Sequence, residues 1–350
     1  MAGKYGIGVV GAGMIGNFHA RAIKGLANAE LIAVCEQVPE RGQKFAAEHG
    51  CKCYEDLEKF LDDGRIDVIT VATPSGMHRD VAVAAARHGK HCIVEKPIEI
   101  TLPRIDAILE AHDKAGTTVG GIFNMRYEAT TKLAKKAVDE GRFGRMTFGM
   151  AYGPWWREQS YYDQGGWRGT WDVDGGGALM NQGIHTIDML QYLMGPVRQV
   201  SAFARTLCHQ RIEVEDTGAV AVEFRSGALG TIACTTSMWP GHFRIIEVAG
   251  ERGTIGLADA KFIFWQFAEE TEDDNHIRAE YLEFPKVSVG AANPSAGMTP
   301  ALHQANFADF LEALDQKRQP TISGAEARKA VRVILAIYES AKSGRPVEIR

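Results

Sequence analysis

The stretch 5–36 constrains the fold most, because it has the order strand, glycine turn, helix, strand and acidic residue. A short apolar run at 5–10 is followed by Gly11, Gly13 and Gly16 in the G-x-G-x-x-G order. The first glycine permits a tight turn, the second lets the backbone approach a pyrophosphate, and the third lets the helix pack closely on the strand. The spacing therefore predicts a turn that binds a dinucleotide.

The residues after the turn indicate which dinucleotide binds. Met14 and Ile15 begin a helix whose first N–H groups can bind phosphate oxygens. A second apolar run ends at Glu36, about twenty residues after Gly16, where a carboxylate can accept hydrogen bonds from the adenosine ribose. Gln37 offers no positive charge to a 2′-phosphate, so NAD is expected in preference to NADP.

Strands and helices alternate up to residue 123, which predicts an α/β fold. Helices are expected at 39–49, 77–88 and 103–115, and strands at 66–73, 91–94 and 117–123. Nearly continuous apolar strands are typical of a parallel sheet that is buried on both faces. Residues 1–123 are therefore predicted to form a doubly wound Rossmann domain whose ligands bind at the carboxyl ends of the strands.

Two of these strand ends carry unusual residues. Thr73 ends one predicted strand and is followed by Pro74, and Glu95 and Lys96 follow another strand, directly before a proline. A lysine at this edge faces the cofactor crevice. The alternative is that Glu95 and Lys96 are charged loop residues without a function. His78 is either a cap or packing residue or a further cofactor contact. The predicted cofactor-binding residues are Gly11, Gly13, Met14, Ile15, Gly16, Glu36, Thr73, Pro74, His78, Glu95 and Lys96.

From residue 124 onward the pattern is that of a second α/β domain, 124–350. Helices are expected at 128–140, 301–315 and 324–342, and the acidic run 269–275 is expected to be a solvated loop. Strands are expected at 146–152, 197–206, 217–224, 228–236, 244–249, 254–257 and 262–267. Short turns join several of these strands, which predicts a large, open, mostly antiparallel sheet.

Aromatic and polar residues are concentrated between 155 and 195. Flat rings that alternate with arginines suit stacking on a sugar or base and binding of an anion, or else they anchor loops in a core. Three glycines at 175–177 then lead into a predicted helix, 177–193, on which Asn181, His185 and Asp188 share one face. The aromatic and arginine positions are Trp155, Trp156, Arg157, Tyr161, Tyr162, Trp167, Arg168 and Trp171.

Over essentially the whole chain these motifs resemble the Gfo/Idh/MocA oxidoreductases. The motifs are the glycine turn, Glu95-Lys96-Pro97 and the triple-glycine helix with His185 and Asp188. The resemblance implies NAD-dependent oxidation or reduction of secondary alcohols of sugars, inositols and related polyols. It also implies that the lysine of E-K-P and the aspartate and histidine of the helix are catalytic. The family's open sheet commonly forms the subunit interface, so a homodimer or homotetramer through the second domain is expected.

One position departs from the family pattern, which usually has aspartate where this chain has Asn181. That asparagine, together with 161–163, 167–171 and 213–218, resembles the branch that oxidises the C3 hydroxyl of UDP-N-acetylglucosaminuronate. Residues 124–127 match that branch only in part, so another glycoside or a free sugar is the alternative substrate. The resemblance implies substrate contacts at Arg126, Tyr162, Trp167, Arg168, Asn181 and His185.

The expected chemistry is hydride transfer from a ring carbon to the nicotinamide, with Lys96, His185 and Asn181 as the catalytic residues. Lys96 would hold the hydroxyl and stabilise the developing alkoxide, and His185 would take its proton. Asn181 can only orient, because an amide has no useful basicity. Three alternatives stay open: an inositol 2-dehydrogenase-like polyol dehydrogenase, an NAD-dependent glycosidase that oxidises C3 transiently, and a regulator that binds the dinucleotide without chemistry.

Composition agrees with a globular enzyme of two domains. The 350 residues are 45% hydrophobic and 24% charged, and a net charge of −5 gives no basic footprint for nucleic acid. No apolar run approaches the ~20 residues of a membrane span, and no leader precedes the first strand, so the cytoplasm is expected. The six cysteines contain no C-x-x-C pair and are interpreted as structural, so no metal is expected.

Overall fold

The computed structural model describes residues 4–284 and 299–349. Backbone contacts divide the described chain into two compact units, 4–124 with 299–331 and 125–284 with 332–349. Each unit has its own sheet. In the described part of the chain, no helix combines the length and apolar character that a membrane span needs.

The first unit is built on a six-stranded parallel sheet in the order β3-β2-β1-β4-β5-β6. This order confirms the predicted Rossmann fold, and it reverses between β1 and β4, where ligands of such sheets bind. The strands are β1 (Tyr5–Val10), β2 (Ala29–Cys35), β3 (Lys52–Tyr54), β4 (Val68–Val71), β5 (His91–Val94) and β6 (Val119–Gly121).

Helices connect these strands, and most of them begin and end close to the predicted positions. The elements β3, α3 and η1 were not predicted, because elements of three to five residues leave too little periodicity in the sequence. The helices are α1 (Met14–Lys24), α2 (Pro39–His49), α3 (Leu57–Leu61), the 3₁₀ turn η1 (Ser75–Met77), α4 (His78–Arg87) and α5 (Leu102–Ala115).

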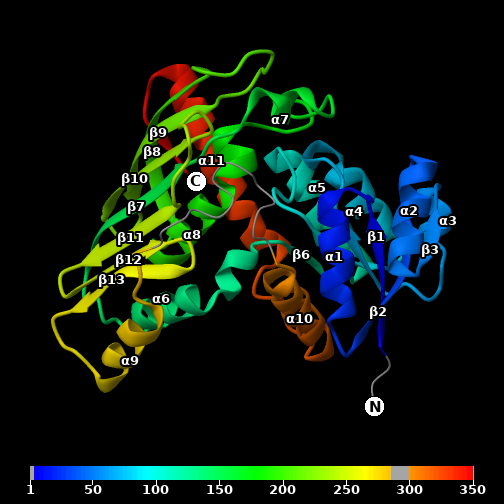
Figure 1. The fold of residues 1–350 in the computed structure, drawn as a ribbon, viewed down its shortest axis with the longest axis horizontal. Helices are drawn as coiled ribbons and strands as arrows, with labels where there is room; N and C mark the ends of the chain where they lie inside the picture. Colours follow the sequence, from blue (N-terminus) through cyan, green and yellow to red (C-terminus); the bar gives the residue numbers. More distant parts are fainter. Residues whose placement is uncertain (1–3, 285–298, 350) are drawn as a thin grey trace. The chain divides into compact units, whose positions relative to one another are not determined.

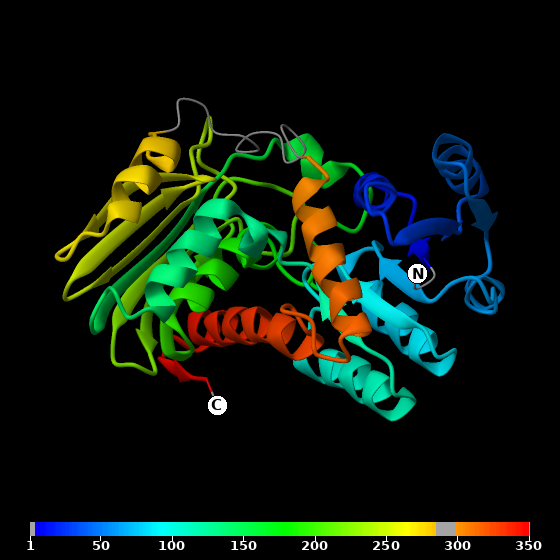
Figure 2. The ribbon, with the colours of Figure 1, turned by 90° about the horizontal axis from the view of Figure 1, so that it is seen from below.

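Helix α10 (Ala301–Asp315) belongs to the first unit, which differs from the predicted partition at residue 123/124. Its Phe307, Phe310 and Leu311 are buried in one hydrophobic cluster with the core of β1 and α1. Asn306 adds two hydrogen bonds, accepting from the N–H of Phe123 at 3.2 Å and donating to the carbonyl of Gly121 at 3.3 Å. Figure 2 shows α10 alongside α1. Apolar side chains far along the sequence thus complete the core of the N-terminal sheet.

The second unit contains an eight-stranded sheet in the order β13-β12-β11-β7-β10-β9-β8-β14. Neighbouring strands are antiparallel except β7 and β10, which run parallel, so the predicted mostly antiparallel sheet is confirmed. The strands are β7 (Met146–Pro154), β8 (Val197–Arg205), β9 (Thr217–Phe224), β10 (Leu229–Thr235), β11 (Ile245–Gly250), β12 (Gly253–Ala258), β13 (Lys261–Phe267) and β14 (Val347–Glu348).

Helix α8 packs on β7 and β11, and α6 packs on α8, along one face of this sheet (Figure 1). The predicted helix 177–193 is divided, because a π-helical turn, η3 (Ala178–Gln182), precedes α8. Helix α11 begins among the residues of the first unit and continues into the second. The remaining elements are the 3₁₀ turn η2 (Asn124–Tyr127), α6 (Ala129–Asp139), α7 (Gln159–Asp163), α8 (Ile184–Met194), α9 (Glu272–Tyr281) and α11 (Gly324–Ser343).

The acidic run 269–275 was expected to be a solvated loop, and this expectation is wrong for its second half. Thr271 and Asp274 form a capping box that begins α9. Asp274 is fully buried and accepts hydrogen bonds from the indole of Trp265 at 2.6 Å and from Arg142 at 2.7 and 2.8 Å. One acidic residue of the run is thus a buried structural anchor, and charge density alone could not distinguish it from its exposed neighbours.

Candidate functional site

The glycine turn between β1 and α1 has the geometry that a dinucleotide phosphate requires. Gly11 has a φ of 100°, and a Cβ on Gly16 would lie 2.0 Å from the carbonyl oxygen of Gly11. A Cβ on Gly13 would meet nothing within 4 Å, and Gly13 caps α1 without any side-chain hydrogen bond. Open space therefore lies beside Gly13 at the N-terminus of α1, the end of a helix whose first N–H groups can bind phosphate oxygens.

Glu36 is held at the end of β2 by backbone donors. Its carboxylate accepts hydrogen bonds from the N–H of Ala12 at 2.9 Å and of Val38 at 3.0 Å. Arg41, in the first turns of α2, places its exposed guanidinium 4.0 Å from the same carboxylate. This basic neighbour was missed in the sequence, because only the uncharged residue adjacent to Glu36, Gln37, was considered.

The loop after β4 contributes a second set of predicted cofactor residues. The hydroxyl oxygen of Thr73, which precedes Pro74, is buried without a hydrogen-bond partner among the described residues, so it fits a polar group of a bound ligand. His78 is different, because it is 1% exposed and both of its ring nitrogens face backbone carbonyl oxygens. This geometry favours the structural interpretation of His78 over cofactor contact.

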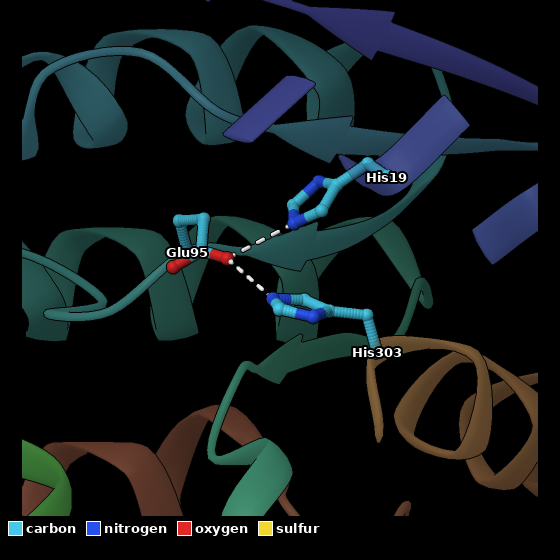
Figure 3. A group of neighbouring side chains, drawn as sticks. All are labelled: His19, Glu95 and His303. Atoms are coloured by element: carbon cyan, nitrogen blue, oxygen red, sulfur yellow. Dashed lines mark hydrogen bonds and ion pairs between the residues drawn. The ribbon is translucent and has the colours of Figure 1, made fainter. Parts of the chain in front are cut away.

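A buried polar cluster surrounds Glu95 at the end of β5 (Figure 3). One carboxylate oxygen lies 2.9 Å from Nε2 of His19 on α1 and 3.5 Å from Nε2 of His303 on α10. The other oxygen accepts the backbone N–H of Lys96 at 2.9 Å. Burial opposes ionisation, yet the two histidines hold the pKa of Glu95 well below its ordinary value. Glu95 therefore anchors the backbone of Lys96, whose side chain is half-buried.

The same three side chains offer ligand atoms within 4.8 Å of one another, a grouping that suits a metal ion. The contacts of the Nδ1 atoms of the two histidines, however, indicate a hydrogen-bonded cluster and not a metal site. Nδ1 of His303 faces the amide nitrogen of Asn124 at 3.3 Å, so it accepts, and Nε2 carries the proton toward Glu95. Nδ1 of His19 is hydrogen-bonded to the hydroxyl of Thr70 at 2.9 Å. Sequence reasoning missed both histidines, because 76 residues separate His19 from Glu95 and His303 lies on α10.

In the second unit, Asn181 is fixed by side chains. Its amide nitrogen donates to Asp174 at 2.5 Å, and its oxygen accepts from Nε2 of Gln182 at 2.6 Å. Gln182 in turn accepts from Arg157 at 2.7 Å, and Asp174 is 1% exposed. Position 181 itself has no carboxylate, but the carboxylate of Asp174 is hydrogen-bonded to it. Asp174 is a loop residue that no periodic pattern could identify.

Glu215 holds the glycine-rich turn that leads to His185. Its carboxylate accepts from the N–H of Gly177 at 3.1 Å and of Leu179 at 2.8 Å, and from the hydroxyl of Tyr338 at 3.0 Å. Burial raises the pKa of Glu215 to about 7. The side chain thus satisfies two N–H groups at the start of η3, the turn directly before α8, while the backbone carbonyl of Glu215 accepts the N–H of Ala178 at 3.0 Å. His185 itself is half-buried near the start of α8.

Arg168 stacks on the predicted aromatic residues. Its guanidinium carbon lies 4.6 Å from the ring centre of Tyr161 and 4.9 Å from that of Trp167. The Nε atom of Arg168 is buried without a hydrogen-bond partner among the described residues. A flat indole beside an unsatisfied arginine donor suits a ligand that has both a ring and an anionic oxygen.

Two predicted substrate contacts are placed differently. Tyr162 is 6% exposed, its hydroxyl lies 2.9 Å from that of Thr236, and burial raises its pKa. Arg126 is 5% exposed and forms a two-bond ion pair with Asp188, at 2.5 and 2.8 Å. This pair also engages the aspartate that the family resemblance implies as catalytic. The geometry favours structural roles for Tyr162 and Arg126, because their polar groups are already engaged inside the unit.

Comparison with known proteins gives consistent matches to one family. Residues 5–122 match the family described as "Oxidoreductase family, NAD-binding Rossmann fold", and residues 131–256 match the "GFO/IDH/MocA C-terminal domain". Myo-inositol 2-dehydrogenase of Thermotoga maritima is 30% identical over 254 residues, which cover 71% of this chain and 74% of that protein. Levoglucosan dehydrogenase of Pseudarthrobacter phenanthrenivorans is 27% identical, with coverage of 71% and 72%.

Several solved structures resemble the chain over 99% of its length. The WlbA dehydrogenase from Bordetella pertussis, in complex with NADH and UDP-GlcNAcA, is 33% identical and has a TM-score of 0.88. The likeness covers 99% of each chain.

Proposed function

This chain belongs to the Gfo/Idh/MocA family of NAD-dependent sugar and polyol dehydrogenases, and from that premise we propose that it oxidises the C3 hydroxyl of a nucleotide sugar. The observation that carries the proposal is the likeness, over 99% of both chains, to a dehydrogenase crystallised with NADH and UDP-GlcNAcA. The stack of Arg168 on Trp167 supports it locally, because such a substrate has a flat base and anionic oxygens.

NAD fits the first unit. The glycine turn and the first N–H groups of α1 would hold its pyrophosphate, Glu36 its adenosine ribose, and the hydroxyl of Thr73 a further polar group. When bound, NAD supplies the acceptor for the hydride of the ring carbon.

The protein's own residues must orient the carbon and move the hydroxyl proton. Lys96, anchored by Glu95 at the end of β5, holds the hydroxyl and stabilises the developing alkoxide by its positive charge. His185 accepts the proton. Asn181 orients the substrate, and its amide is kept in one orientation by Asp174 and Gln182.

The oligomer is also part of the proposal. The sheet face of the second unit opposite α8 exposes Phe203 by 71%, Leu229 by 59% and Phe148 by 42%. Leu229 pairs with Phe148 across β10 and β7, so these side chains lie on one face. An apolar sheet face of this kind is stabilised by covering it with a second copy, which supports a homodimer or homotetramer. The six free cysteines support a reducing compartment, the cytoplasm.

A substrate panel tests the proposal. Purified enzyme with NAD is offered UDP-N-acetylglucosaminuronate, levoglucosan and myo-inositol, and the absorbance of NADH is followed. We expect the highest kcat/KM with the nucleotide sugar. Because the chain is 30% identical to a myo-inositol 2-dehydrogenase, myo-inositol is the second candidate substrate. Preferential oxidation of myo-inositol would show that it is the better substrate and would contradict the proposal. Release of free sugar without net NADH would indicate a glycosidase, and cofactor binding without either product a regulator.

A further inference from the structure

His78, the first residue of α4, connects two loops of the first unit. Its Nδ1 lies 2.9 Å from the carbonyl oxygen of Pro97, and its Nε2 lies 2.9 Å from the carbonyl oxygen of Thr73. Thr73 follows β4, and Pro97 follows Lys96 at the end of β5. The imidazole therefore bridges the backbones of both loops that carry predicted cofactor residues.

A second side chain joins the same two segments. Arg104, on α5, donates to the carbonyl oxygen of Gly76 at 2.5 Å and to the carboxylate of Glu99 at 2.7 Å. Glu99 is fully buried and also accepts the N–H of Ile100 at 2.5 Å. The loop of Thr73 and the segment after Lys96 are thus tied at two independent points. The bridge at His78 is the one that reaches the residue adjacent to Lys96.

The bridge depends on which nitrogen of His78 carries a proton, since a carbonyl oxygen can only accept a hydrogen bond. A neutral imidazole has one N–H and holds one carbonyl, whereas an imidazolium holds both. Burial lowers the pKa of His78, while both carbonyl bonds and the nearby carboxylates of Glu99 and Glu95 favour its protonated form. His78 holds the carbonyl of Pro97 only in the states with a proton on Nδ1.

We propose that His78 is a positioning residue: its Nδ1–H holds the carbonyl of Pro97 and so fixes the turn that presents Lys96. The role complements that of Glu95, which accepts the N–H of Lys96 from the other side. Lys96 is thereby held on both flanks by buried groups. The inference rests on the proposed function, in which Lys96 holds the reacting hydroxyl.

Two amide substitutions separate the two ends of the bridge. Asparagine places its amide nitrogen near the position of Nδ1, and glutamine places it near that of Nε2. His78→Asn should keep the bond to Pro97, and His78→Gln should keep only the bond to Thr73. His78→Ala removes both. His276→Gln, at a histidine whose side chain is 79% exposed, is the matched control.

We expect the three variants to differ in kcat, with little change in their affinity for NAD. His78→Gln and His78→Ala should lose about tenfold in kcat, the scale of one neutral hydrogen bond, while His78→Asn stays within about threefold of the parent. The dissociation constant of NAD, measured by fluorescence, should stay within about twofold in all three variants. Equal kcat in the asparagine and glutamine variants, or a greater loss with asparagine, would overturn the proposal.

A second measurement is independent of substrate, so it distinguishes failure of this inference from failure of the proposed function. In the parent, ¹⁵N spectra of histidine-labelled protein should show His78 protonated on Nδ1, and a proton on Nε2 alone would contradict the inference. The backbone amide resonance of Lys96 should be retained in His78→Asn and displaced in His78→Gln. Displacement in both variants, or in neither, would contradict it.

Discussion

Glu36 in the first unit and Asn181 in the second are held by different means. The carboxylate of Glu36 accepts two main-chain N–H groups. Asn181 is held by Asp174 and Gln182, side chain to side chain. A main-chain N–H is present at every non-proline position, whereas a side-chain network depends on the identity of each of its members. Substitutions in the two units should therefore have different consequences.

The largest effect is expected in the second unit, at His185. His185→Asn should lower kcat by about 10²- to 10⁴-fold, the usual contribution of a general base. The kcat profile of the parent should fall on the acid side, because imidazolium cannot accept the hydroxyl proton, and this limb should vanish in the variant. Asn181→Ala, which disturbs only positioning, should cost less. Persistence of the limb in His185→Asn, with kcat within a few-fold of the parent, would assign the base to another group, such as Lys96 or Tyr161.

In the first unit, Lys96→Met should lower turnover by at least ~100-fold, since it removes one positive charge from the developing alkoxide. Because backbone groups form the predicted dinucleotide site, the affinity for NAD should stay within a few-fold. Titration of cofactor fluorescence and steady-state kinetics measure the two quantities. Lys44→Met, at an exposed lysine of α2, is the control. Normal turnover in Lys96→Met would remove Lys96 from the catalytic residues.

A smaller effect concerns the choice of cofactor. The Glu36 carboxylate should repel a 2′-phosphate, so kcat/KM should favour NAD over NADP by about tenfold, the ratio that ~1.4 kcal/mol gives. Arg41, 4.0 Å from Glu36, can offset part of that repulsion. Arg41→Gln should therefore raise the preference for NAD a few-fold further. Equal use of both cofactors by the parent would contradict the assignment of Glu36.

A further change is expected in stability. The pKa of Glu215 is raised from 4.5 to about 7, so the folded state retains a proton that the unfolded chain releases. This contribution to the free energy of unfolding is fully present below about pH 4.5 and is lost as the pH rises to about 7, with a slope of at most ~1.4 kcal/mol per pH unit.

Urea denaturation across this range should therefore show a shallower decline for Glu215→Gln than for the parent. Glu30→Gln, at an exposed glutamate of β2, should decline like the parent. Identical slopes in Glu215→Gln and the parent would show that Glu215 ionises normally in the folded protein.

The same contrast explains how far the sequence could predict this molecule. The strands β1, β5 and β9 and the helices α2 and α10 begin and end where predicted, because apolar periodicity and glycine stops are local. The packing of α10 on the first sheet was missed, since it depends on side chains nearly two hundred residues from that sheet.

The candidate residues follow the same division. The glycine turn has the predicted geometry because each of its constraints acts on backbone atoms a few residues away. Arg126, a predicted substrate contact, is paired with Asp188, an interaction across 62 residues that no local pattern indicates. Asp174 lies in a loop without periodicity, and its importance follows only from its contact with Asn181.

Transfer of deuterium tests the central claim most directly. UDP-N-acetylglucosaminuronate carrying deuterium at C3 is incubated with the enzyme and NAD, and the reduced cofactor is analysed by mass spectrometry. The proposed function predicts that the reduced nicotinamide carries the deuterium in amounts equal to the oxidised sugar formed. Reduced cofactor without deuterium, or no reduction while another sugar or polyol is oxidised, would contradict oxidation at C3 of this nucleotide sugar.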